Sequence, residues 1–414
     1  MGILNRFFRI AQGYYHNRVI GIPPAYADNL DPFPRIIGTR TLQLSNEDNL
    51  RLNVLLAQPL QAVRINESTM TVHALTERGE AKVRLNPTAR DEQYLRWVRE
   101  LLSMKVTGSP GGYPIFLKRW TRMGHARNNL DQMLLLGEPE AVAAVVYTPG
   151  LTHDIARRAW WASPSATNAR CLLENPEVVA GELGKELTAY LLEFLPFEEI
   201  QLDVVDTVRL CLQGELIPPS ERTKLWERAK RKNPFYIGFL HADPTYIPLP
   251  DNPHRHHADL IAQLAKLLEN GNPYAQALSQ TLDSAGQNWL RALQLALEKP
   301  VDQEVVISLF IAIDKRFPLP LPESRGVRDL NAALQRAEQF CHTNDDCPAD
   351  AKAVRDTLNP DTLPLFKAML ILAQMGEDSL IPYFGGNDSV GSVMRKRLEP
   401  LIKPLLAQTN LLLK

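Results

Sequence analysis

The strongest candidate for binding chemistry in the sequence is a basic segment that surrounds an indole. Trp120 lies among Lys118, Arg119, Arg122 and Arg127. Such a combination can bind phosphate and stack on a nucleic-acid base. Cations at helical spacing more often form a solvated face or contact a protein partner, so both interpretations stay open. The predicted binding surface, which includes a nearby arginine pair, comprises Lys118, Arg119, Trp120, Arg122, Arg127, Arg157 and Arg158.

Two cysteines form a second candidate site. Cys341 and Cys347 flank a short polar loop that is long enough to close as a disulfide. Their spacing is not CxxC, and the surrounding sequence contains no sign of a lowered thiol pKa. A possible redox or sulfur-handling site at these two thiols is therefore an alternative hypothesis. Cys171 and Cys211 lie among apolar residues and are predicted to be small core side chains.

Other reactive residue types lack the spacing of known sites. His254, His256 and His257 are close in sequence and could contact zinc, but adjacent side chains diverge and no HExxH or finger spacing is present. We interpret them as an exposed polar helix start. The sequence has no recognisable catalytic triad order, carboxylate pair or nucleotide fingerprint. We therefore predict no catalytic residue, no metal and no cofactor, and whether the chain is an enzyme stays open, with a noncatalytic role favoured.

The elements that would position these residues are predicted from helix-start signals. Such signals recur about every dozen residues, at Glu138-Pro139, Thr152, Ser163-Pro164 and Asn175-Pro176. Helices this short are marginal in water and must be stabilised by packing. We predict a mainly α protein whose helices form an irregular α-solenoid-like array. Further helices are expected at 182–194, 202–212, 220–232, 257–268, 274–297, 301–316, 328–340, 348–358, 362–375 and 390–406, with Ser220 capping the third.

Alternating apolar residues predict a small antiparallel β-meander near the N-terminus. Its strands are expected at 62–65, 69–75 and 80–85. A helix at 89–104, with Thr88 and Asp91 as a capping box, is expected to cover the sheet. The predicted division of the chain is a flexible extension (1–39), this α+β module (40–107), a helical array (108–247) and a C-terminal helical region (248–414).

Composition limits the class of protein. Among 414 residues, 46 are basic and 47 are acidic, so net charge gives no general attraction to nucleic acid or anionic membranes. No apolar run is long enough to cross a bilayer, and no signal-peptide pattern is present. With four scattered cysteines, these features predict a cytoplasmic protein.

Five segments resemble the DsrS family. They are residues 47–56 (EDNLRLNVLL), 77–83 (ERGEAKV), 90–95 (RDEQYL), 109–114 (SPGGYP) and 156–162 (ARRAWWA). That family is known as a sulfur reduction protein and is encoded with the dissimilatory sulfite reductase system of sulfur-oxidising bacteria. The resemblance implies a cytoplasmic protein that is accessory to the oxidation of stored sulfur. It brings no catalytic motif that could be assigned to these residues.

Together, the resemblance and the helical pattern predict a noncatalytic accessory protein that binds, regulates or supports a protein of the sulfite reductase system. The first alternative is an RNA- or nucleotide-binding regulatory protein, acting through the Trp120 segment. The second is thiol-based sulfur handling at Cys341 and Cys347. The sequence does not predict the oligomeric state.

Overall fold

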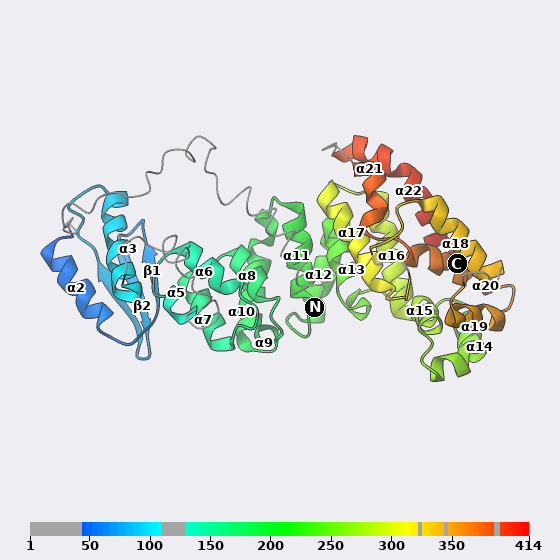
Figure 1. The fold of residues 1–414 in the computed structure, drawn as a ribbon, viewed down its shortest axis with the longest axis horizontal. Coiled ribbons are helices and arrows are strands. Elements are labelled where there is room, and N and C mark those ends of the chain that lie inside the picture. Colours follow the sequence, from blue (N-terminus) through cyan, green and yellow to red (C-terminus); the bar gives the residue numbers. More distant parts are fainter. Residues whose placement is uncertain (1–43, 109–129, 322–324, 343–346, 385–389, 414) are drawn as a thin grey trace. The chain divides into compact units, whose positions relative to one another are not determined.

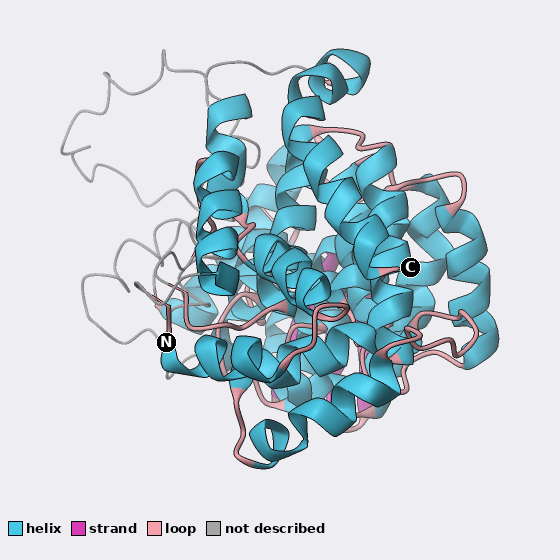
Figure 2. Cartoon of the chain, turned by 90° about the vertical axis from the view of Figure 1, so that its right-hand side faces the viewer, coloured by secondary structure: helices cyan, strands magenta, loops and turns pink. Residues whose placement is uncertain are grey.

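The computed structural model describes residues 44–108, 130–321, 325–342, 347–384 and 390–413. Contacts group Leu44–Lys414 into one compact unit. Helices make up most of the described chain, and the one sheet has three antiparallel strands (Figures 1 and 2). The predicted fold class, mainly α with a small β-meander, is confirmed. The predicted extension at 1–39 lies outside the described residues.

The sheet consists of β1 (Leu60–Asn66), β2 (Thr71–Thr76) and β3 (Gly79–Arg84), in that order. Val72 of β2 lies opposite Ile65 of β1 and Val83 of β3. Helix α3 (Asp91–Thr107) buries Val98 and Leu102 with the apolar side chains of the strands, as predicted. Its N-cap is Arg90, so the predicted capping box at Thr88 is wrong.

Helix α2 (Asn46–Leu56), which precedes the sheet, was not predicted. The Ser45 hydroxyl caps it by accepting a hydrogen bond from the backbone N–H of Asp48. Asp48 is fully buried and accepts a 2.5 Å hydrogen bond from the Tyr94 hydroxyl of α3. The same carboxylate oxygen accepts the Asn86 backbone N–H at 2.7 Å. These bonds attach α2 to the rest of the module, because a buried carboxylate is stable only with such donors.

The next helices are short, as their closely spaced start signals predict. They are α5 (Leu130–Met133), α6 (Pro139–Val146), α7 (His153–Ala162), α8 (Ala166–Leu172), α9 (Pro176–Val179) and α10 (Glu182–Phe194). Thr152 caps α7 and Asn175 caps α9, as expected. Helix α8 is capped by Ser165 instead of Ser163, because Ser165 has the extended backbone that lets its hydroxyl accept the Asn168 N–H. These helices enclose one apolar cluster that also includes Leu210 and Cys211.

The remaining helices surround a second, larger apolar cluster that extends from Leu195 to Leu412. They are α11 (Gln201–Cys211), α12 (Pro219–Ala229), α13 (Pro234–His241), α14 (His257–Glu269), α15 (Pro273–Leu282), α16 (Ser284–Glu298), α17 (Gln303–Arg316), α18 (Leu330–His342), α19 (Ala349–Thr357), α20 (Leu363–Ala373), α21 (Ile381–Phe384) and α22 (Gly391–Leu412), with 3-10 turns η2 (Leu195–Phe197), η3 (Pro244–Tyr246) and η4 (Glu377–Leu380). Residues on both sides of position 248 belong to this cluster, so the division proposed there stays a prediction.

Three predicted helix boundaries in this region are wrong. The single helix expected at 274–297 is two helices, because the Asp283 carboxylate accepts the Gly286 N–H and begins α16. Helix α12 begins at Pro219, so Ser220 lies inside its first turn and is not its cap. Helix α22 continues to Leu412, because buried Leu405, Thr409 and Leu412 extend its apolar face.

Helix α13 lies at the centre of the larger cluster. It packs on α11, α12, α16 and α17. Gly238 allows the closest approach, since a Cβ atom at that position would lie 2.6 Å from the Val208 side chain of α11. Helix α11 faces both clusters: Leu210 and Cys211 belong to the smaller one, and Val205 and Val208 to the larger. Charged side chains on and around α11 therefore lie where the two cores meet.

Candidate functional site

The residues predicted to form a binding surface are only partly within the described chain. The segment with Lys118, Arg119, Trp120, Arg122 and Arg127 lies outside the described residues. Arg157 is exposed on α7. Arg158 forms an ion pair of 2.5 Å with Asp154, one turn earlier on the same helix. An ion pair within one helix explains the placement of Arg158 without a ligand.

The two cysteines of the possible redox site are thiols in this structure. Cys341 is buried and Cys347 is half-buried. Burial raises the pKa of Cys341 to about 11 and also raises the pKa of Cys347. The Cys347 thiol points at the carbonyl oxygens of Phe340 and Pro348, at 3.9 and 3.7 Å. Both side chains are therefore protonated near neutral pH, the less nucleophilic form of a thiol.

The histidines are separated by the fold. His256 and His257 lie at the start of α14, whereas His254 is buried, contrary to the exposed helix start that was predicted. His241 lies at the end of α13, with its Nε2 atom 2.9 Å from both the carbonyl and hydroxyl oxygens of Ser308 on α17. Among the described residues, no group of three or more His, Cys, Asp or Glu side chains could hold a metal ion.

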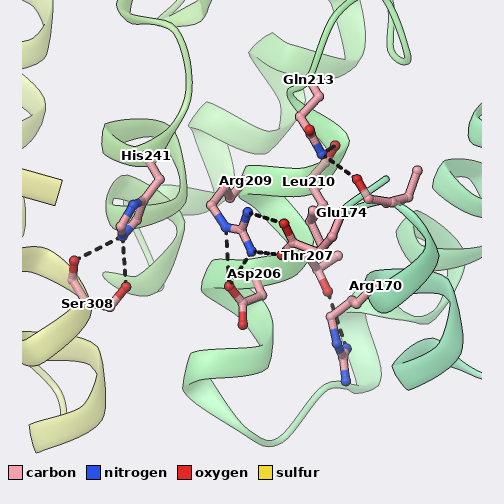
Figure 3. Close-up of polar contacts among 10 residues, drawn as sticks. Arg170, Glu174, Asp206, Thr207, Arg209, Leu210, Gln213, His241 and Ser308 are labelled. Atoms are coloured by element: carbon pink, nitrogen blue, oxygen red, sulfur yellow. Dashed lines mark hydrogen bonds and ion pairs between the residues drawn. The ribbon is translucent and has the colours of Figure 1, made fainter. Parts of the chain in front are cut away.

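Sequence reasoning missed a network of charges on α11 (Figure 3). Arg209 binds the carboxylates of Asp206, on its own helix, and Glu174, which follows α8. Burial alone would lower the pKa of Arg209, but Asp206 and Glu174 outweigh burial and raise it. Gln213 donates a hydrogen bond of 3.1 Å to the Leu173 carbonyl oxygen beside this pair. Both contacts join the α8 end of the smaller core to α11.

Arg170 of α8 forms a second ionic connection to the beginning of α11. Its guanidinium donates to Glu198 at 3.1 Å, to Asp203 at 2.8 Å and to the Thr207 hydroxyl at 3.4 Å. The Arg170 side chain is only 12% exposed. The other oxygen of Glu198 accepts the backbone N–H of Ile200. Arg170 therefore fixes the connection between α10 and α11 at several points.

The local charges also alter the titration of Asp203. Burial raises the pKa of Asp203 to about 6, although Arg170 favours its ionised form. Glu198 and Asp206 act in the same direction as burial, because they are further negative charges nearby. Protonation of Asp203 therefore takes place much closer to neutral pH than is usual for an aspartate.

The connection fixed by Arg170 carries an exposed aromatic tip. We define this tip as residues 193–199, with sequence EFLPFEE, which end α10 and include the turn η2. Phe197 is 77% exposed and Phe194 is 44% exposed. Leu195, which lies between them, is buried and belongs to the larger core. Glu193 and Glu199 are exposed on either side. The tip thus presents two phenyl rings surrounded by carboxylates.

Aromatic packing supports the tip from α7 and α10. Phe194 packs on Tyr190 with ring centroids 4.5 Å apart, and Tyr190 packs edge-on against Trp160 at 4.9 Å. The Trp160 indole N–H donates a 2.7 Å hydrogen bond to Glu186. The tip is therefore supported by the contacts of Phe194 with Tyr190 and by the ion pairs of Arg170. This arrangement suits recognition of a protein surface, because aromatic side chains on a fixed backbone bind with little ordering cost.

Comparison of the chain with protein-family models, curated proteins and solved structures found no match. Across the described residues, no helix has the combination of length and apolarity needed to cross a membrane.

Proposed function

We propose that this chain is a noncatalytic accessory protein of cytoplasmic sulfur oxidation, and that it binds a protein partner of the dissimilatory sulfite reductase system through the aromatic tip at residues 193–199. The pathway rests on the resemblance of the five sequence segments to the DsrS family. The mode of action rests on one observation, which is that Phe194 and Phe197 are exposed on a rigidly supported turn.

Physical chemistry favours a binding role for this turn. The Phe197 ring, the more exposed of the two, contributes little to folding, whereas its burial against a partner would remove a large apolar surface from water. Phenylalanine is enriched at the centre of protein interfaces, whereas the rims of interfaces are polar. The partner surface should therefore contain an apolar recess bordered by Lys or Arg.

The proposal is tested by retention of proteins from a lysate of sulfur-oxidising cells, with and without nuclease. The immobilised chain is compared with Phe194→Ala/Phe197→Ala. The matched control is Leu50→Ala/Val54→Ala, which removes two exposed apolar side chains from α2. We expect the original chain and the control to retain a component of the sulfite reductase system after nuclease treatment, and the tip variant to lose it.

Two results would contradict the proposal. Retention of no such component by the original chain would remove the protein-partner function. Equal retention by the tip variant, or a loss confined to the α2 control, would assign the docking surface to another part of the chain. Loss of all binding after nuclease would instead support the RNA-binding alternative.

A further inference from the structure

A groove along the last helix has the chemistry opposite to that of the aromatic tip. Its volume is about 310 Å³, and its apolar lining includes Leu297 of α16 and Ile402 of α22. Arg395, Lys396 and Lys403 line it together with the acidic side chains of Glu298 and Glu399, so the lining has a net positive charge. Such a volume is near the lower limit of pockets that bind small ligands, so the groove can receive an aromatic side chain.

The basic character of the groove extends along α22, which is coloured red in Figure 1. Residues 390–413 contain four basic side chains and one acidic side chain, Glu399. Glu399 lies beside Lys403 and forms an ion pair of 2.5 Å with it. Arg395 donates a hydrogen bond of 3.3 Å to the carbonyl oxygen of Pro300 and is thereby held at the groove. Lys396 and Arg397 are exposed on the same helix.

The tip has the complementary charge. Residues 186–208, which contain it, include six Asp or Glu side chains and no Lys or Arg. Four of these six have partners inside the fold: Glu198 and Asp203 pair with Arg170, Asp206 pairs with Arg209, and Glu186 accepts a hydrogen bond from Trp160. The other two, Glu193 and Glu199, are exposed beside the phenylalanines in the sequence. An apolar projection beside two exposed carboxylates and an apolar groove with a net positive charge are therefore present on one chain.

We infer that the aromatic tip of one copy docks in the α22 groove of a second copy. The phenyl ring of Phe197, the most exposed aromatic side chain of the tip, would lie against Leu297 and Ile402 in the groove. Glu193 and Glu199 would face Lys396 and Lys403. Opposite charges surrounding an apolar contact favour this pairing and fix its orientation.

This pairing is heterologous, because the two surfaces are different and each copy keeps one of each unused. Such contacts add further copies head to tail unless the rotation closes a ring. The inference goes beyond the proposed function, since the α22 groove has no part in partner binding. Because partner and second copy would use the same tip, binding of either one would exclude the other there.

The test is sedimentation velocity of the full chain at increasing concentration, at low and moderate salt. We expect the average mass to rise with concentration and to fall with salt, which screens exposed charges. Glu193→Lys/Glu199→Lys and Lys396→Glu/Lys403→Glu should each weaken association about tenfold or more, since each reverses two contacts. Lys224→Glu/Lys230→Glu, which changes two exposed side chains of α12, is the matched control and should associate normally. Circular dichroism establishes that all variants fold.

Mixing the two variants gives the sharpest result. The tip variant retains a normal groove and the groove variant retains a normal tip, and the two reversed surfaces are again opposite in charge. The mixture should therefore associate although neither variant does so alone. A wild-type chain that is monomeric at all concentrations would overturn the inference, as would association that survives in either variant. A monomeric chain that binds phosphatidylglycerol vesicles through Lys396 and Lys403 would assign the groove to lipid and also overturn it.

The self-association test is independent of the proposed function. The groove variant should lose self-association while it still retains the sulfite reductase component from lysate. If the partner is absent but head-to-tail association is observed, the proposed function fails alone. If the partner is retained but the chain stays monomeric, only the inference about α22 fails.

Discussion

Acid should destabilise the chain through one imidazole, that of His241. Burial, with Lys315 and Arg209 nearby, lowers the pKa of His241 to about 3 from its ordinary 6.5. The folded protein therefore holds this imidazole neutral, with Nε2 directed at Ser308 of α17 (Figure 3). The unfolded chain binds a proton at His241 between pH 6.5 and about 3, while the folded chain does not.

The sign and size of the effect follow from this difference. Because the unfolded state binds more protons in that window, the free energy of unfolding falls as the pH falls through it. The loss is about 1.4 kcal/mol per pH unit below the unfolded pKa. At about pH 5 the contribution of His241 therefore amounts to a loss of up to about 2 kcal/mol relative to neutral pH.

The perturbation is His241→Gln, which keeps a hydrogen-bond donor near Ser308 but cannot take up a proton. Urea unfolding of both proteins is followed by circular dichroism at about pH 7 and about pH 5. We expect the original chain to lose about 2 kcal/mol more than the variant over this interval. Equal losses in the two proteins would refute the assignment of a neutral, buried imidazole.

Four further predictions concern other parts of the structure. Asp203→Asn should make the chain more sensitive to acid. The pKa of Asp203 is raised from 3.8 to about 6, so its protonation contributes stability that is present below pH 3.8 and lost as the pH rises through 6, and the variant lacks this contribution. Urea unfolding of both proteins at about pH 6.5 and about pH 4.5 measures the difference in the free energy of unfolding. Gly238→Ala should destabilise the fold by about 1–3 kcal/mol, because the new methyl group would overlap Val208, and a calorimetric melt that matches the original chain would contradict the packing of α11 on α13. Arg170→Met should lower the free energy of unfolding by about 2 kcal/mol, which is less than for a fully buried ion pair because the carboxylates of Glu198 and Asp203 are partly exposed. At a temperature where the variant is folded, it should also retain less of the partner. Cys341 should react with iodoacetamide much more slowly than a free cysteine at about pH 7.5, because its thiol is buried and has a pKa of about 11. Rapid labelling would restore the hypothesis of thiol-based sulfur handling. A persulfide found by mass spectrometry after exposure to a sulfur donor would also restore it.

Helices with amphipathic patterns and local caps were predictable from the sequence, whereas helices defined by tertiary packing were not. Thr152 and Asn175 mark helix starts through hydrogen bonds within three residues, so their effect can be read locally. Helix α13 has the sequence PFYIGFLH, in which almost every side chain is buried, and therefore lacks a polar face to reveal its period. Its glycine, normally unfavourable in a helix, is needed because Val208 lies so close.

Helix α2 was missed for a different reason. Its exposed Leu50 and Val54 interrupt the polar face that an amphipathic helix should have, so the apolar residues do not follow one stripe. The buried anchor of α2 is a carboxylate, that of Asp48, which sequence patterns assign to the surface. Its partner Tyr94 lies 46 residues further along the chain, so only the folded structure reveals the contact.

The candidate site illustrates the same limit of local reasoning. The lysine and arginine residues around Trp120 are easy to recognise in the sequence, because residue type alone determines their charge. In contrast, the significance of Phe197 depends on exposure, and an LPF segment after a helix is equally compatible with burial in the core. Leu195, two residues away, is in fact buried.

The rigidity of the tip depends on Arg170, whose partners Glu198 and Asp203 are 28 and 33 residues away. A lone arginine on a short helix predicts neither partner, since a surface ion pair with a neighbour on the same helix, such as Arg158 with Asp154, has the same appearance in sequence. The sequence does contain one signal, which is that residues 186–208 include six acidic residues and no Lys or Arg. Four of these six carboxylates are bound inside the fold, by Trp160, Arg170 and Arg209. The acidic stretch therefore indicates internal ion pairs as readily as a binding surface, and only the exposure of Phe197 in the folded chain separates the two.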